Sequence, residues 1–331
     1  MKKCFVVFCA FAIVFAVSAE SPAYAKTVFK ISNQFPSSHN ISKALVFFAE
    51  KVKEYSNEEI EAQLFDAGQL YKDTEILEAL QDNLVECGVA TLVRWSGMIG
   101  LIDIFELPFA FKDYAAVKTF LDRGGDEIFT SEFRKKGVQN LAWLDNAFNQ
   151  MFNNKHPLKV PADFKGLTMR SIGKGDSEIL SALGAAPTVM SSSELYMALQ
   201  RGTMDGTTTT MDAAVSRKLL EVQKYMTESN YSVSEIVLQA NLEWWDGLPA
   251  ATRDILIRAA RDTEAWVRSE ITAVDDKSRE TLLAAGMEIY HPTDESRQLY
   301  IEATQSLREK YLQKTGETGK KLLDLAEAAS R

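Results

Sequence analysis

Two arginines stand where short apolar stretches end, and a guanidinium group is well suited to binding an anion. Arg170 is one residue from the end of 166–171, which we predict to be a strand, and Arg94 follows the strand-like run 86–92. The planar guanidinium offers parallel N–H donors that match a carboxylate. From the residues alone, Arg170 could equally cap a helix or pair with a surface acid, and Arg94 could be a charge at a rim.

Residue patterns typical of catalysis are missing from the sequence. It contains no GxSxG, HExxH or CxxC pattern. The three histidines, His39, His156 and His291, are scattered and lack the spacing of metal ligands. Cys87 lies in the strand-like run 85–90, which favours a buried, inert thiol over a nucleophile. We therefore expect a protein that is not an enzyme and uses neither a cofactor nor a metal.

Length and charge set the broad class. The chain has 331 residues, of which 46% are hydrophobic and 25% charged, so it is long enough for two lobes with separate cores. Its formal net charge is −9, which argues against nucleic acid as a partner.

The first 25 residues resemble a secretory signal peptide. Lys2 and Lys3 precede an apolar run from 4 to 17, which is short for a membrane span, and 23–25 (Ala-Tyr-Ala) fits a cleavage site. We expect the mature chain to begin at Lys26 and to be periplasmic; an uncleaved anchor is the alternative. Cleavage would leave Cys87 as the remaining cysteine, so no internal disulfide is expected.

Strand and helix patterns alternate along the mature chain, which predicts α/β lobes with mixed, mostly parallel sheets. Ligands in such sheets collect beyond the carboxyl ends of strands, so the loops 34–39 and 93–95 are candidate cleft linings. Asp73 precedes a predicted helix and could cap it. The expected strands are 27–32, 59–65, 86–92, 138–145 and 234–240, and the expected helices include 75–81, 250–285 and 294–329.

The order of several segments resembles the DctP-type substrate-binding proteins of TRAP (tripartite ATP-independent periplasmic) transporters. The most specific parts are the stretch 167–206, which contains Arg170, and the segment 68–79. Further similar segments are 104–112, 221–225 and 244–249. The resemblance covers nearly the whole mature chain. It implies a two-lobed periplasmic-binding-protein fold.

The resemblance also implies how the chain divides. We expect residues 26–147 and 234–275 in the first lobe, and 148–233 and 276–331 in the second. The predicted helix from Ala250 has no internal Gly or Pro before Ala285, so at ~1.5 Å per residue it is long enough to span both lobes.

In the family, the arginine that matches Arg170 grips the carboxylate of an organic acid, and some relatives have a ligand-facing arginine that matches Arg94. Gln34, His39 and Asp73 match loop positions that line the cleft in relatives. Trp95 is a candidate for stacking on a flat ligand, with packing in the protein interior as the alternative.

Three departures from the family pattern fall on positions that set ligand selectivity. Asn149 stands where several acid-binding relatives carry a second arginine, and Thr209 replaces an asparagine that commonly touches ligand. Ser192 stands where some relatives place an aromatic ring that stacks on the ligand. These three residues can form hydrogen bonds but carry no charge, so the sequence does not name the acid.

Together these features predict a monomeric periplasmic receptor that binds a small organic acid and delivers it to the membrane permease subunits of a TRAP transporter. A periplasmic binding protein that serves a membrane sensor is the alternative from the same fold, and a secreted hydrolase is a more distant one.

Overall fold

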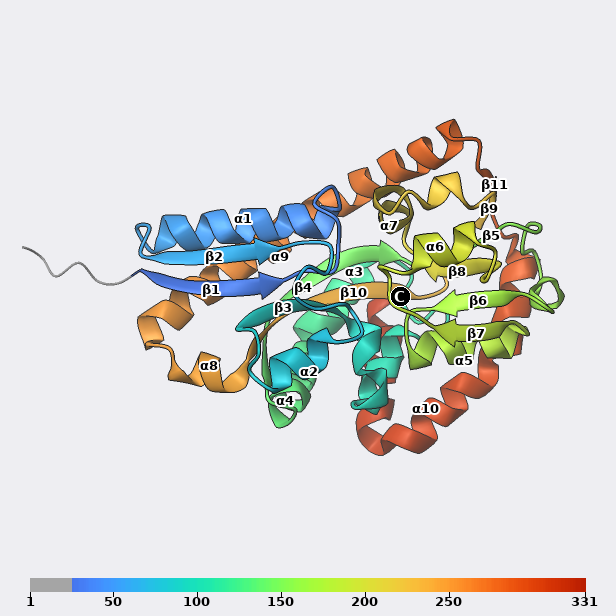
Figure 1. Ribbon diagram of the computed structural model, residues 1–331. Coiled ribbons are helices and arrows are strands. Elements are labelled where there is room, and N and C mark those ends of the chain that lie inside the picture. The colour runs from blue at the N-terminus through green and yellow to red at the C-terminus, as the bar shows by residue number, and fades with distance from the viewer. Residues whose placement is uncertain (1–25) are drawn as a thin grey trace, which may run out of the picture.

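The computed structural model describes residues 26–331. The predicted signal peptide, with Lys2, Lys3 and the proposed cleavage site, lies outside these residues. Two sheets form the centres of two lobes, and Figure 1 shows the first sheet on the left and the second on the right. The two-lobed α/β fold expected from the sequence is confirmed.

The first sheet has the strand order β2-β1-β3-β10-β4. β1 pairs in parallel with β2 and β3, whereas β10 runs antiparallel between β3 and β4 because the chain returns through it from the second lobe. All nine residues of β10 are buried, as expected for a central strand covered on both faces. The strands are β1 (Thr27–Ser32), β2 (Ile60–Phe65), β3 (Cys87–Thr91), β4 (Val138–Phe148) and β10 (Val233–Asn241).

The second sheet has the order β11-β9-β5-β8-β6-β7. Its parallel part is β8-β6-β7, and the strand that carries Arg170, β6, lies in the middle of that part. The strands are β5 (Gln150–Asn153), β6 (Thr168–Ser171), β7 (Ala186–Val189), β8 (Gly206–Thr209), β9 (Tyr225–Thr227) and β11 (Glu288–Tyr290).

Helices cover both sheets and bury apolar stripes against them. In α1 (Asn40–Tyr55), Ala44, Leu45, Phe48 and Val52 recur at helical spacing and are buried. The shorter helices are α2 (Ile76–Gln81), α3 (Tyr114–Phe120), α4 (Asp126–Lys135), α5 (Lys174–Leu183), α6 (Leu195–Gln200), α7 (Met211–Ser216) and α8 (Leu242–Gly247), with 3₁₀ turns η1 (Leu92–Gly97) and η2 (Gly100–Phe105). The helix α5 ends at Gly184, whose φ of 103° is a left-handed conformation that suits glycine.

Two long helices connect the lobes. The helix α9 (Ala250–Ala284) packs against α1 and β4 of the first lobe and against α7 of the second, as the sequence predicted. The helix α10 (Asp294–Ala329) is broken at Gly316 and contacts η2 and α3 as well as α5 (Figure 1). Among residues 26–331, no helix combines the length and the apolar character needed to cross a membrane.

Cys87 lies fully buried in the core between the first sheet, α1 and α9. Burial raises the pKa of its thiol well above the usual value, which keeps the sulfur in its less reactive protonated form. The interpretation of Cys87 as an inert core residue agrees with this position.

Candidate functional site

The strand β6 delivers Arg170 to the boundary between the lobes. Its side chain is 2% exposed, and β8 and β7 flank it on either side. The guanidinium is held in place by the segment after β7: Nε donates to the carbonyl oxygen of Met190 (3.1 Å) and Nη2 to the hydroxyl of Ser192 (2.8 Å). Burial lowers the pKa of Arg170 to about 10, so the group stays charged at neutral pH.

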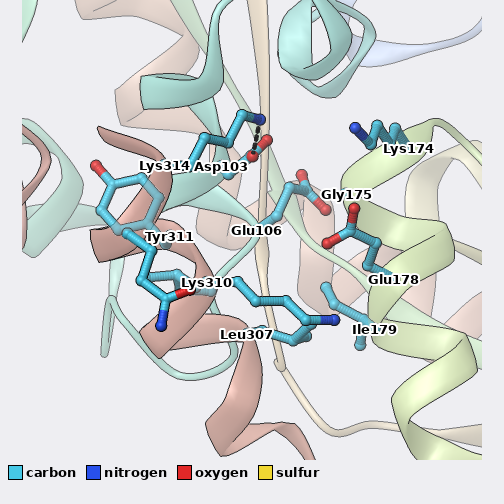
Figure 2. A pocket seen from close by; sticks show the side chains of 12 residues that line it. Asp103, Glu106, Lys174, Gly175, Glu178, Ile179, Leu307, Lys310, Tyr311 and Lys314 are labelled. Atoms are coloured by element: carbon cyan, nitrogen blue, oxygen red, sulfur yellow. Dashed lines mark hydrogen bonds and ion pairs between the residues drawn. The ribbon is translucent and has the colours of Figure 1, made fainter. Parts of the chain in front are cut away.

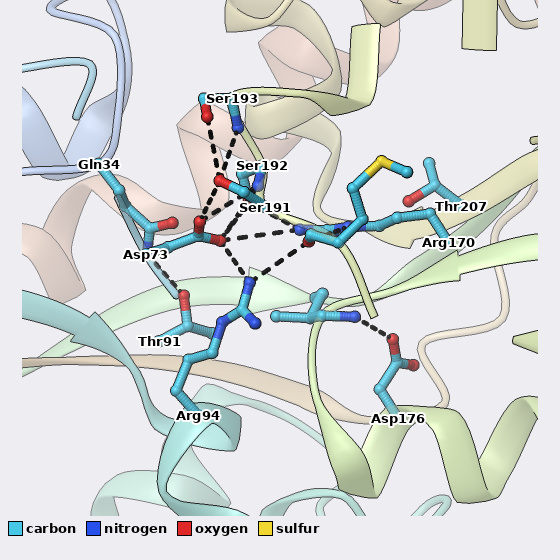
Figure 3. A network of polar contacts seen from close by, with 12 residues as sticks. Gln34, Asp73, Thr91, Arg94, Arg170, Asp176, Ser191, Ser192, Ser193 and Thr207 are labelled. Atoms are coloured by element: carbon cyan, nitrogen blue, oxygen red, sulfur yellow. Dashed lines mark hydrogen bonds and ion pairs between the residues drawn. The ribbon is translucent and has the colours of Figure 1, made fainter. Parts of the chain in front are cut away.

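Asp73 brings the first lobe into contact with this group. Its carboxylate accepts hydrogen bonds from the hydroxyls of Ser191 (2.7 Å) and Ser192 (2.8 Å), and Arg94 Nη2 lies 2.6 Å from Oδ2. The same Oδ2 atom is 3.8 Å from Arg170 Nη2. Asp73, Arg94, Arg170, Ser191 and Ser192, called the Asp73 network below, thus join the two lobes (Figure 3).

The arginines and serines of the Asp73 network keep the Asp73 carboxylate ionised. Burial alone would raise the pKa of Asp73, but Arg94, Arg170 and the serine hydroxyls together hold it well below its usual range. The carboxylate is therefore ionised. The expectation that Asp73 caps the following helix is wrong: α2 begins after Glu75 without a side-chain cap, because the Asp73 carboxylate is bound across the lobe boundary.

Gln34 and His39 lie in the loop after β1, as expected for that end of the first sheet. Gln34 donates from Nε2 to the hydroxyl of Thr91 (2.8 Å). His39 caps α1 by accepting from the backbone N–H of Ile41 (3.1 Å), and burial lowers its pKa to about 4, so the ring is neutral. Its Nε2 atom is buried and has no hydrogen-bond partner among residues 26–331.

Asn149 and Thr209 lie where β4 passes into β5, beside the carboxyl end of β8. Asn149 donates from Nδ2 to the hydroxyl of Ser232 (3.0 Å), while its Oδ1 atom is buried and has no partner among the described residues. Thr209 is 7% exposed and pairs with Gln150 of β5.

Trp95 follows Arg94 in η1, but its side chain belongs to the hydrophobic core. Its side chain is completely buried, its indole N–H donates to Gln239 (3.1 Å), and its ring packs on Phe133 at 5.2 Å between centroids. Of the two interpretations of Trp95, packing in the protein interior describes its position in this structure, and stacking on a ligand does not.

One arginine at the lobe boundary was not singled out from the sequence. Arg217, directly after α7, donates to the carbonyl oxygens of Gln34 (3.2 Å) and Ser192 (3.4 Å). Gln34 and Arg217 are 183 positions apart, so no local pattern connects them. The position of Arg217 in the sequence could have indicated it, because this residue ends a short helix that begins just after β8.

Several polar atoms at the lobe boundary lack partners. Arg94 Nε, Asn149 Oδ1 and His39 Nε2 are all buried without a hydrogen bond among residues 26–331, although such atoms also occur elsewhere, for example in Glu235. A buried polar atom without a partner costs free energy. These three atoms are free to donate a hydrogen bond to, or accept one from, a polar group that enters the boundary.

A separate pocket of about 380 Å³ lies between η2, α5 and α10 (Figure 2). None of the sequence-predicted site residues lines it. Its lining mixes lysines with acids, and Lys314 is already paired with Asp103 at 2.9 Å. The pocket therefore offers an anion less uncompensated positive charge than the lobe boundary does. No group of three or more metal-binding side chains occurs among residues 26–331.

The two lobes meet at a polar, arginine-rich boundary, an arrangement suited to holding an anionic solute. The family model described as bacterial extracellular solute-binding protein, family 7 (DctP), matches residues 31–315. The chain belongs to this family, which confirms the resemblance found in the sequence.

Individual members of the family are similar to this chain over most of its length. It is 33% identical over 300 residues to the C4-dicarboxylate-binding periplasmic protein DctP of Rhodobacter capsulatus, covering 89% of this chain and 90% of that protein. A TRAP periplasmic solute-binding protein of Shewanella oneidensis with bound succinate has a TM-score of 0.88 at 26% identity, covering 93% and 100%. The sugar acid binding protein DctPAm of Advenella mimigardefordensis, in complex with galactonate, shows the same fold, with a TM-score of 0.88 at 24% identity over 92% and 98%.

Proposed function

We propose that this protein is the extracytoplasmic solute receptor of a TRAP transporter. It binds a small organic acid between the two lobes and delivers it to the membrane permease without chemical change. In this proposal the predicted signal peptide directs the protein to the periplasm, where it acts as a monomer. The lobes comprise residues 26–147 with 234–275 and residues 148–233 with 276–331.

The observation that carries the proposal is a buried guanidinium, Arg170, fixed at the boundary between the lobes beside a second arginine, Arg94. This guanidinium is buried, fixed by Met190 and Ser192, and 3.8 Å from the nearest carboxylate oxygen of Asp73. A fixed cation in a water-poor boundary attracts a carboxylate more strongly than one in water, because the local dielectric constant is lower. Arg170 is the main carboxylate donor in this proposal, and Arg94 serves a second acidic or polar group.

In this proposal the neighbouring residues set which acid the site prefers. Gln34, His39, Asn149, Thr209 and Ser192 supply hydrogen bonds without charge. Succinate, bound by the relative from Shewanella oneidensis, and galactonate, bound by the relative from Advenella mimigardefordensis, bracket the range of acids to consider.

A thermal-shift screen tests the proposal. A ligand at 100 times its Kd stabilises the folded protein by about 2.7 kcal/mol, which raises the melting temperature by several degrees. We expect organic acids to produce this shift, and neutral sugars, amides and cations not to. Mass spectrometry of the purified protein should then identify an organic acid as the ligand it carries. A neutral compound as the tightest binder, or turnover of the bound acid, would contradict the proposal.

A further inference from the structure

Arg217 lies at the boundary of the lobes, beside the Asp73 network. Its guanidinium reaches from the end of α7 to the carbonyl oxygens of Gln34 and Ser192, at 3.2 and 3.4 Å, and lies over the ring of Phe35 at 5.5 Å. The hydroxyl of Ser192 also accepts a hydrogen bond from Arg170. Two guanidinium groups from different elements therefore contact the same residue.

Positive charge exceeds negative charge around Ser192. Arg94, Arg170 and Arg217 gather there, whereas Asp73 is the carboxylate that contacts them directly, through Arg94 at 2.6 Å and Arg170 at 3.8 Å. Among residues 26–331, no carboxylate oxygen lies within 4.0 Å of an Arg217 nitrogen. Its acceptors are two carbonyl oxygens, which carry only partial charge.

The other acids nearby have different partners. Asp176 accepts from the hydroxyls of Thr208 (2.6 Å) and Tyr231 (2.8 Å), and burial raises its pKa, which weakens it as a counter-ion. Asp212 accepts from the backbone N–H of Asn40 (2.8 Å). Neither carboxylate compensates Arg217.

The Arg217 side chain is half-buried, so its charge loses part of its hydration without gaining a counter-ion in direct contact. Burial lowers the pKa of Arg217 to about 10, with Asp73 as the opposing influence. The group remains charged at neutral pH. A bound anion with a second negative group would supply the missing counter-charge.

We propose that Arg217 is a specificity-determining residue, which binds a second anionic group of the ligand and so selects diacids over monoacids of the same shape. The inference rests on the proposed function, since it concerns the same ligand. Arg170 holds one carboxylate and Arg217 the other. Asn149 and Thr209 carry no charge. Arg94 is already paired with Asp73 at 2.6 Å, so in this inference Arg94 serves a polar group of the ligand and Arg217 binds the second charge.

A purely structural role for Arg217 makes a different prediction. Its bond to Gln34 links the two lobes, so its loss could weaken closure around any ligand. In that case mono- and diacids would lose affinity by the same factor. The difference between the two losses is therefore the informative quantity.

The test pairs each diacid with its half-amide, which has nearly the same shape and one charge less. Succinate with succinamate, and glutarate with glutaramate, are titrated by calorimetry into the full mature chain and into Arg217→Gln and Arg217→Lys. The exposed Arg201 provides the matched control, because Arg201→Gln removes the same charge from the same lobe. Circular dichroism and melting curves establish that each variant is folded.

We expect the unmutated protein to bind the diacid more tightly than its half-amide. Arg217→Gln should lower affinity for the diacid at least tenfold more than for the half-amide, Arg217→Lys should restore part of the preference, and Arg201→Gln should leave it unchanged. Equal losses for both ligands, or an unmutated protein that does not prefer the diacid, would overturn the role of Arg217 but leave the proposed function standing. Failure of every organic acid to bind would refute the proposed function itself.

Discussion

Replacement of Arg170 by methionine removes the charge and donors while keeping much of the side-chain volume. Removing one partner of a buried ion pair costs roughly 3–5 kcal/mol. At about 1.4 kcal/mol per factor of ten, affinity for an organic acid should fall by roughly 100- to 5,000-fold. The burial of Arg170 and its fixation by Met190 and Ser192 favour this range over the smaller value of an exposed pair.

Calorimetric titration with the best acid from the thermal-shift screen measures the loss. Arg170→Lys should restore only part of the affinity, because lysine keeps the charge but lacks the planar fork. Arg201→Met makes the same change on the exposed surface and should bind as the unmutated protein does. If Arg170→Met is folded by circular dichroism and still binds within a few-fold of the unmutated protein, the assignment of Arg170 as the main carboxylate donor is refuted.

Four other predictions concern stability, processing and motion. Burial raises the pKa of Glu264 from 4.5 to about 7, so between these pH values the folded state holds more protons than the unfolded state, and stability falls as pH rises. Glu264→Gln should therefore raise the melting temperature at pH 8 but not at pH 4. The control Glu270→Gln, at an exposed position, should change the melting temperature at neither pH. A Cβ at Gly206 would lie 2.1 Å from a backbone oxygen of β5, so Gly206→Ala should destabilise by about 3 kcal/mol in urea unfolding, while Gly247→Ala, with open space around it, should be nearly neutral. N-terminal sequencing of exported protein should start at Lys26, and a mature chain that retains the first residues would contradict the signal peptide. Small-angle scattering should show a smaller radius of gyration with bound acid; an unchanged radius at saturation would argue against closure, provided that the empty protein is shown to be open.

Elements with strong local patterns were predicted well. The strand at 27–32 and the helix at 294–329 match the structure at both ends, and the long helix from Ala250 ends one residue earlier than predicted. Alternation in the strand and long runs of helix-forming residues in the two helices act locally, so they can be detected without knowledge of the fold. The break at Gly316 depends on a single residue, with φ 58° and ψ −143°, inside an otherwise helical sequence, and it was not predicted.

The candidate site was predicted only where the family pattern named its residues. Arg94, Arg170, Asp73 and Ser192 form one network in the structure, although their separations along the chain exceed any local pattern. Arg217 was missed because its partners come from distant segments. The helix cap expected of Asp73 was wrong for the same reason: a serine pair from the other lobe binds this carboxylate instead of the nearby backbone.

The two strand segments that cross between the lobes, 148–150 and 230–233, are bonded to each other. Phe148 pairs with Val233, the Asn149 backbone N–H donates to the Ser232 carbonyl at 2.9 Å, and the Gln150 and Asn230 side chains bond at 2.6 Å. They therefore form one two-stranded ribbon and not two independent connections. A two-stranded ribbon resists bending within its plane, and α9 and α10 also join the lobes, so we expect the lobes to move relative to each other in few directions. Closure should then follow a similar path in every cycle, and each acid would meet the arginines from a reproducible direction.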